Sequence, residues 1–135
     1  MKSKVVNDLQ RQLGNLFKSK GIVSAYLFGS QAKGKLGPLS DVDIAIQLDA
    51  SVLSHQRFQF KLHFLDKLTK RLKTDHVDLV LLEEAPLLLA HRILRDGQLL
   101  YCRNQKSRIR NEFRLLTNYL DFQEDLALYA SAVLR

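Results

Sequence analysis

A glycine–serine pair is followed, after ten residues, by two aspartates that are separated by a single residue. The stretch GSQAKGKLGPLSDVDIAI, residues 29–46, contains both features. Residues 22–28, IVSAYLF, come directly before it and have the apolar, β-branched and aromatic character of a buried strand. Because Gly29 has no Cβ, the backbone at the end of this strand can turn closely around a ligand, and the following N–H groups can face an anion. The feature predicts a strand, an anion-binding turn and a second strand in one compact unit.

The second strand of this unit is expected over residues 41–48, DVDIAIQL. Its even-numbered positions are all apolar, so Asp41 and Asp43 lie on the opposite face, about 7 Å apart along the strand. Two carboxylates so placed can converge on metal ions ~4 Å apart, the arrangement used in two-metal phosphoryl chemistry. The alternative is an acidic pair on an exposed strand face. The glycine–serine turn beside the pair favours the metal site.

Composition narrows the class of protein. The chain has 135 residues, 46% of them hydrophobic and 26% charged, as is typical of one globular domain with its own core. No apolar run approaches the ~20 residues that cross a bilayer, and no signal sequence follows the first methionine. Cys102 is the single cysteine, which excludes an internal disulfide; we expect it to be a buried strand residue. These features predict a cytoplasmic protein whose one domain spans residues 1–135.

The net charge of +7 favours anionic partners. A polyanionic nucleotide, an acidic protein surface and a nucleic acid all satisfy this condition. No basic stripe with interleaved aromatic residues accompanies the charge, so direct nucleic-acid binding stays an open but weaker alternative. The basic residues are concentrated in two groups, Lys2, Lys4, Arg11, Lys18, Lys20, Lys33 and Lys35, and then Arg103, Lys106, Arg108, Arg110 and Arg114.

Hydrophobic periodicity outlines an α/β (α+β) chain in which helices and strands alternate. A short helix is expected between the first two strands. The predicted helices cover residues 4–18, 52–72, 86–95 and 106–134, and the predicted strands cover residues 22–28, 41–48, 76–82 and 98–102.

The last predicted helix carries two apolar stripes instead of one. Such a broad apolar surface can pack on the domain with one side and on a partner with the other. Periodicity alone equally allows a helix that simply packs on its own core. The stripes are Ile109, Phe113, Leu116 and Leu120, and then Phe122, Leu126, Tyr129 and Val133.

The signature in residues 29–43 resembles that of the nucleotidyltransferase superfamily that includes DNA polymerase beta and the kanamycin nucleotidyltransferases. The short chain is similar to the minimal nucleotidyltransferase branch, whose pattern is Gly-Ser, ten residues and Asp-x-Asp. Lys33 stands where that branch usually has arginine, which keeps the charge but loses the planar fork for phosphate. The resemblance implies a small mixed sheet of about four strands flanked by helices. It also implies a long C-terminal helix over residues 105–135, available for core packing and for a partner.

The same family carries a third carboxylate on a later strand, and Asp78 is the candidate here. It lies inside the apolar run HVDLVLL, residues 76–82, where an aspartate is costly to bury without a compensating cation or partner. If this strand lies beside residues 41–48, Asp78 completes a cluster of three acids. The alternative is an aspartate at a strand end that reaches solvent.

The tail of the chain resembles that of antitoxins paired with HEPN-domain toxins, in the stretches NEFR, residues 111–114, and YLDF, residues 119–122. This resemblance implies an enzyme that uses Mg²⁺ and ATP to transfer AMP to a tyrosine of a HEPN ribonuclease toxin. It implies phosphate contacts from the turn and metal ligation by the acids, with Asp78 also favouring deprotonation of the acceptor hydroxyl. The implied nucleotide-binding residues are Gly29, Ser30, Lys33 and Ser40, and the implied catalytic and metal-binding residues are Asp41, Asp43 and Asp78.

Two other functions stay open at this point. A non-catalytic antitoxin would neutralise its toxin by binding alone, with a vestigial site. A nucleotidyltransferase acting on a small molecule or an RNA end would need no protein partner. The full set of acids disfavours the first alternative, and the small size of the chain disfavours the second.

Overall fold

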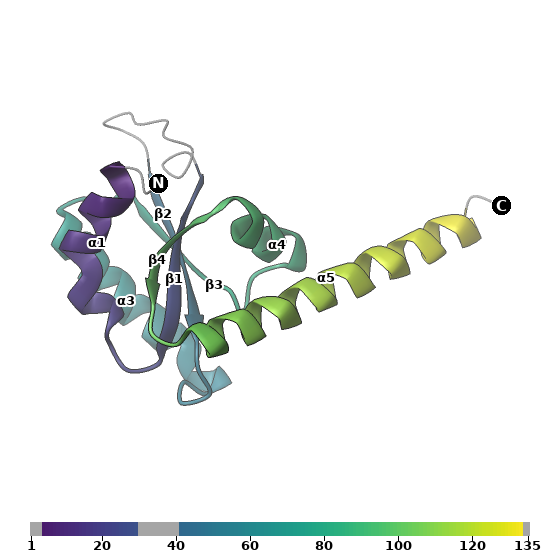
Figure 1. Cartoon of the computed structure of the whole chain (residues 1–135), viewed down its shortest axis with the longest axis horizontal. Coiled ribbons are helices and arrows are strands. Elements are labelled where there is room, and N and C mark those ends of the chain that lie inside the picture. The colour runs from purple at the N-terminus through teal and green to yellow at the C-terminus, as the bar shows by residue number, and fades with distance from the viewer. Residues whose placement is uncertain (1–3, 30–40, 134–135) are drawn as a thin grey trace.

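The computed structural model describes residues 4–29 and 41–133 of the chain (Figure 1). The short helix expected between the first two strands lies outside the described residues, as do Ser30, Lys33 and Ser40. The other expected elements are present within a few residues of their predicted ends. In chain order they are α1 (Lys4–Phe17), β1 (Ile22–Phe28), β2 (Val42–Leu48), the short 3-10 helix η1 (Ser54–Gln56), α3 (Arg57–Leu72), β3 (Val77–Leu81), α4 (Leu87–Asp96), β4 (Gln98–Cys102) and α5 (Gln105–Val133).

The four strands form one mixed sheet in the order β3-β2-β1-β4. β1 is antiparallel to both of its neighbours, whereas β2 and β3 are parallel and are joined by the crossover helix α3. A parallel pair requires such a crossover, because a tight hairpin can join only antiparallel strands. The predicted α/β class and mixed sheet are confirmed.

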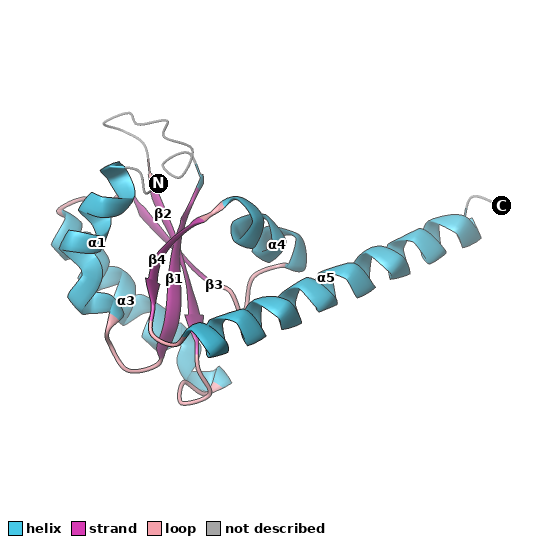
Figure 2. Cartoon of the chain, viewed as in Figure 1, coloured by secondary structure: helices cyan, strands magenta, loops and turns pink. Residues whose placement is uncertain are grey.

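Helices cover both faces of the sheet (Figure 2). α1 and α3 pack on one face, where Leu13 and Phe17 of α1 and Leu68 of α3 meet Ile44 and Ile46 of β2 in the larger core cluster. The alternation of side chains along β2 directs these isoleucines to that face and leaves Asp43 on the other. The acids predicted for the site therefore share their face of the sheet with α4 and α5.

A buried polar network holds the first half of α5 against the sheet. The Tyr26 hydroxyl donates to Glu112 Oε1 at 2.6 Å and accepts hydrogen bonds from Ser24 Oγ at 3.1 Å and Gln47 Nε2 at 2.7 Å. Asn111 Nδ2 donates to Gln47 Oε1 at 3.3 Å. Burial, together with the hydrogen bond to Glu112, raises the pKa of Tyr26 well above its usual range, so the hydroxyl stays protonated. The network fixes where α5 leaves the domain.

α5 then extends away from the rest of the molecule (Figure 1). None of its 29 residues is buried, and both apolar stripes are exposed, with Phe113 at 69% and Tyr129 at 70%. The alternative in which this helix simply packs on its own core is therefore wrong. Within the described residues, its first half meets α4, where the rings of His91 and Tyr119 stack with their centroids 3.9 Å apart. A cavity of about 390 Å³, lined in part by Phe113 and Leu116, lies between the same two helices.

Two details differ from expectation. Cys102 lies in β4 as expected but is only partly buried, because β4 is the last strand of the sheet and has one neighbour. The helix expected from residue 52 begins later, at Arg57, after the separate turn of η1. None of the helices in the described part of the chain is long and apolar enough to span a membrane.

Candidate functional site

Asp43 and Asp78 lie side by side at one end of the sheet. They are register partners in the parallel pairing of β2 with β3, so their side chains project from the same face on strands about 4.8 Å apart. Asp43 is half-buried and Asp78 is exposed. The structure thus brings together the two acids that the sequence placed on separate strands. Asp78 is also exposed near the start of β3, so the alternative of a strand-end aspartate that reaches solvent stays open.

Gly29 lies next to Asp43 on the side away from Asp78. It follows β1, whose last residue Phe28 is the antiparallel partner of Asp43. The backbone at Gly29 has φ +74°, and a Cβ built there would lie 2.2 Å from Asp43 Oδ2 and 3.1 Å from its Cγ. Glycine is favoured at this position, because any other residue meets both a strained backbone and the carboxylate, which would have to move.

Asp41 stands just before β2 and contacts the start of the next strand. Its Oδ1 is 3.4 Å from His76 Nδ1, and the backbone N–H of Val42 donates to the His76 carbonyl at 2.8 Å. Both side chains are largely exposed. His76 therefore lies beside the first of the acids.

The acids repel one another. Burial is the main cause that raises the pKa of Asp43, and the nearby charges of Asp78 and then Asp41 raise it further. No lysine or arginine within the described residues forms an ion pair with any of the three. Three carboxylates at one strand end, with His76 beside Asp41 but no lysine or arginine paired to them in the described residues, form a site that favours a cation.

The donor set suits a hard divalent cation. Mg²⁺ prefers carboxylate oxygens, and Asp41, Asp43 and Asp78 offer these. As the side chains stand, no group of three or more acidic, histidine or cysteine residues in the described ranges is gathered closely enough to hold a metal ion. The chemistry of the donors and their mutual repulsion fit Mg²⁺.

Sequence reasoning missed two features of this face. It identified Gly29 only as a turn, whereas the structure shows that its missing Cβ makes room for Asp43. It also missed the network around Tyr26, although the polar residues Ser24 and Gln47 inside two otherwise apolar strands are a signal of buried hydrogen bonding.

Comparison of the sequence with models of known protein families identifies the family of this chain. The sequence model of the family described as "Polymerase beta, Nucleotidyltransferase" matches residues 11–106, which include the described site. The chain belongs to this nucleotidyltransferase family. No curated protein matches its sequence.

Solved structures similar to this nucleotidyltransferase cover nearly its whole length. One is a crystal structure of a toxin–antitoxin with AMP-PNP, at 24% identity and a TM-score of 0.71, covering 96% of this chain and 98% of the other. A crystal structure of the toxin–antitoxin MntA–HepT has 23% identity and a TM-score of 0.64, with 97% of each chain covered. A third is a tri-AMPylated Shewanella oneidensis HEPN toxin in complex with MNT antitoxin, at 22% identity and a TM-score of 0.64, again covering 97% of each chain. Because 96–97% of this chain is covered, most of α5 lies within the part that is similar.

Proposed function

We propose that this nucleotidyltransferase is the antitoxin of a HEPN ribonuclease toxin and transfers AMP from ATP, with Mg²⁺, to a tyrosine hydroxyl of that partner. The observation that supports it most directly is the placement of Asp43 between Gly29 and Asp78 at one strand end. The similar structures support the choice of partner and of nucleotide, because one holds AMP-PNP and another pairs an MNT antitoxin with an AMPylated HEPN toxin.

We propose a different role for each group of site residues, according to where it lies. We propose that the turn at Gly29 and Ser30 contacts the triphosphate, assisted by Lys33 and Ser40. Gly29 leaves the backbone free to approach the phosphates while Asp43 stays close behind it. Asp78 is exposed, so an incoming acceptor can reach it, and we propose that it favours removal of the proton from the attacking hydroxyl.

We propose that Asp41, Asp43 and Asp78 hold the divalent ion. When bound, Mg²⁺ supplies the positive charge that neutralises the triphosphate. The chain contributes by positioning: β2 and β3 fix the two facing aspartates, and no covalent intermediate on the protein is needed. Attack of the acceptor oxygen on the α-phosphorus forms the new ester, and pyrophosphate leaves with the electron pair of the broken bond.

The test is intact-mass analysis of the HEPN partner after incubation with ATP, Mg²⁺ and this protein. Wild type is expected to add AMP to the partner, and Asp43→Asn and Asp78→Asn are expected to abolish the addition. Asp75→Asn is the matched control, because Asp75 is an exposed acid that lies just before β3. Addition by both variants at the wild-type rate would refute the assignment of the acids.

A binding-only antitoxin is a second candidate, favoured by the exposed stripes of α5. Leu120 and Leu126 are 55% and 50% exposed, and contiguous apolar surface of this kind marks protein interfaces. In this alternative Asp43→Asn would still neutralise the toxin fully, whereas truncation after Ser107 would abolish neutralisation. In either case we propose one domain over residues 1–135, with residues 105–135 as the partner-binding helix.

A further inference from the structure

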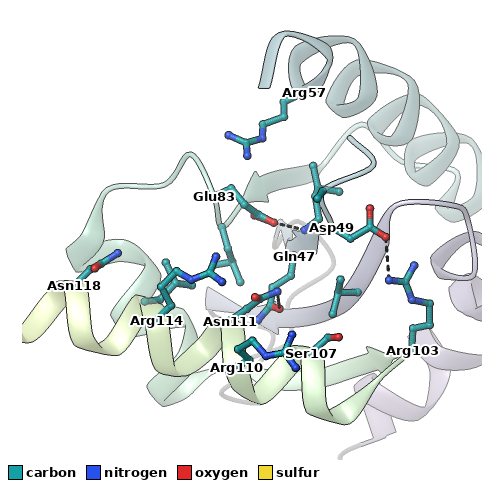
Figure 3. Close-up of a pocket in the computed structure, with 15 residues that line it drawn as sticks. Gln47, Asp49, Arg57, Glu83, Arg103, Ser107, Arg110, Asn111, Arg114 and Asn118 are labelled. Carbon is teal, nitrogen blue, oxygen red and sulfur yellow. Dashed lines mark hydrogen bonds and ion pairs between the residues drawn. The ribbon is translucent and has the colours of Figure 1, made fainter. Parts of the chain in front are cut away.

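A second cavity lies at the opposite end of β2 from Asp43. Its volume is about 570 Å³, it is partly open to solvent, and it is lined by the ends of β2 and β3, the start of α3 and the first half of α5 (Figure 3). Cavities of roughly 300–1,000 Å³ are typical of small-molecule sites. We call it the arginine cavity, defined by its polar lining residues Gln47, Asp49, Arg57, Glu83, Arg103, Ser107, Arg110, Asn111, Arg114 and Asn118.

The arginine cavity has a net positive charge, and some of its arginines form no ion pair with the described residues. Four arginines line it against two acids, so the lining has an excess of two positive charges. Arg103 is paired with Asp49 at 2.9 Å. Arg110 and Arg114 have no ion pair or hydrogen bond to any described residue, although they stand one helical turn apart on α5. Like charges at this spacing repel, so the pair does not stabilise the helix.

The wall opposite α5 contains polar atoms that the fold leaves without partners. Arg57 Nε and Glu83 Oε2 are buried and make no hydrogen bond, while Glu83 Oε1 accepts one from the Leu48 backbone N–H. Unpaired buried polar atoms destabilise a fold, and beside a cavity a bound ligand or water can supply the missing hydrogen bonds. Asn118 lines the same cavity from α5 and offers an amide that can donate or accept.

We infer that the arginine cavity is a second ligand site, which binds a small phosphomonoester through Arg110 and Arg114. A phosphomonoester carries about −1.5 to −2 charges at pH 7, which matches the excess of the lining. Guanidinium groups bind phosphate oxygens in a bidentate manner. Asn118 lines the cavity and can contact the sugar or other polar body of the ligand, as can the side-chain oxygen of Asn111, whose Nδ2 donates to Gln47. The site is separate from the proposed reaction site, since the two lie at opposite ends of β2.

An RNA strand fits this cavity less well than a small molecule. No aromatic side chain lines it, whereas single strands are usually held by stacking of bases on aromatic rings. The lining residues come from several elements around a partly open hollow and do not form a ridge along one element (Figure 3). RNA is therefore an outcome that the test must distinguish.

The test is a titration of the isotopically labelled full chain with inorganic phosphate and with AMP, followed by NMR. Mg²⁺ is left out to disfavour binding at the acids. Saturable shifts are expected at the side-chain amides of Asn111 and Asn118, and AMP is expected to bind more tightly than phosphate. Arg110→Gln/Arg114→Gln should raise the Kd for AMP at least tenfold. The matched control is Lys67→Gln/Arg92→Gln, which removes the same charge from exposed positions outside the cavity and should change the Kd less than twofold.

Three results would overturn the inference. The first is an absence of saturable shifts around the cavity. The second is equal weakening by both double variants, which would reduce the effect to overall charge. The third is binding of an RNA oligonucleotide or an acidic peptide that depends on the two arginines while phosphate and AMP do not bind. None of these outcomes bears on transfer of AMP, which depends on the acids at the other end of β2.

Discussion

Replacing Gly29 with alanine inserts a methyl group where the structure leaves no room. The new Cβ would lie 2.2 Å from Asp43 Oδ2, and ordinary contact requires about 3.4 Å. The carboxylate must therefore move by roughly 1 Å, since the flexible end of a side chain yields more readily than the backbone. The substitution displaces one proposed metal ligand without removing any charge.

Two magnitudes follow from this geometry. The left-handed backbone at Gly29, with φ +74°, destabilises a non-glycine residue by about 1–2 kcal/mol, so the free energy of unfolding should fall by that amount. A displacement of about 1 Å in a catalytic group can lower the rate on the order of 100-fold. We expect a modest loss of stability and a large loss of AMP transfer.

Two other glycines supply controls. Gly21 has φ +98° and a Cβ there would lie 2.6 Å from Val52 Cγ2, far along β1 from the acids, so Gly21→Ala should destabilise the fold but spare transfer by the folded protein. Gly14 lies in α1 with open space around it, so Gly14→Ala should raise stability by about 0.5–1 kcal/mol.

The assays are urea denaturation and the initial rate of AMP transfer, both on folded, monodisperse protein. The reasoning is refuted if Gly29→Ala transfers AMP within threefold of wild type while losing the expected stability. It is also refuted if Gly21→Ala loses transfer to the same extent, because the effect would then report on the fold and not on the site.

Three further perturbations test other parts of the structure. Burial raises the pKa of Glu83 from 4.5 to about 7, so between these pH values the folded state binds a proton that the unfolded state has lost. The stability of the folded state therefore falls as pH rises. In denaturation curves, wild type should lose roughly 2–3 kcal/mol of unfolding free energy between pH 5 and pH 8 relative to Glu83→Gln. Tyr26→Phe removes the hydroxyl that Glu112 and Gln47 share as a hydrogen-bond partner, and it should lower the unfolding free energy by about 1–3 kcal/mol in the same assay. An unchanged unfolding free energy would mean that water replaces the hydroxyl. Leu126→Arg, on the exposed part of α5, should change the unfolding free energy by no more than about 0.5 kcal/mol from wild type. It should weaken toxin binding at least tenfold, measured by calorimetry. An unchanged affinity would place the interface elsewhere.

Local patterns in the sequence are enough to predict the elements and the position of two acids. Asp43 and Asp78 each interrupt an apolar strand, and period-two alternation fixes the face on which each lies. The pairing of these strands is not a local property, since it depends on the crossover of α3, and the resemblance to a family supplied it. Ser30, Lys33 and Ser40, outside the described residues, stay predictions.

The surroundings of the site were beyond sequence reasoning for a different reason. The arginine cavity combines Arg57 with Arg110 and Arg114, which are more than fifty residues away along the chain. The contact of Gly29 with Asp43 depends on the antiparallel register of β1 with β2, which no short motif encodes. The apolar stripes of α5 were visible, but periodicity says nothing about whether a helix has a surface of its own to pack against.

Transfer of label from ATP to the HEPN partner tests the central claim most directly. Two parallel reactions with Mg²⁺ would contain ATP labelled at the α-phosphate or at the γ-phosphate, with wild type and Asp43→Asn in each. The account predicts that only the α-label reaches the partner, and only with wild type. Label from the γ-phosphate, or α-label that persists with Asp43→Asn, would contradict it.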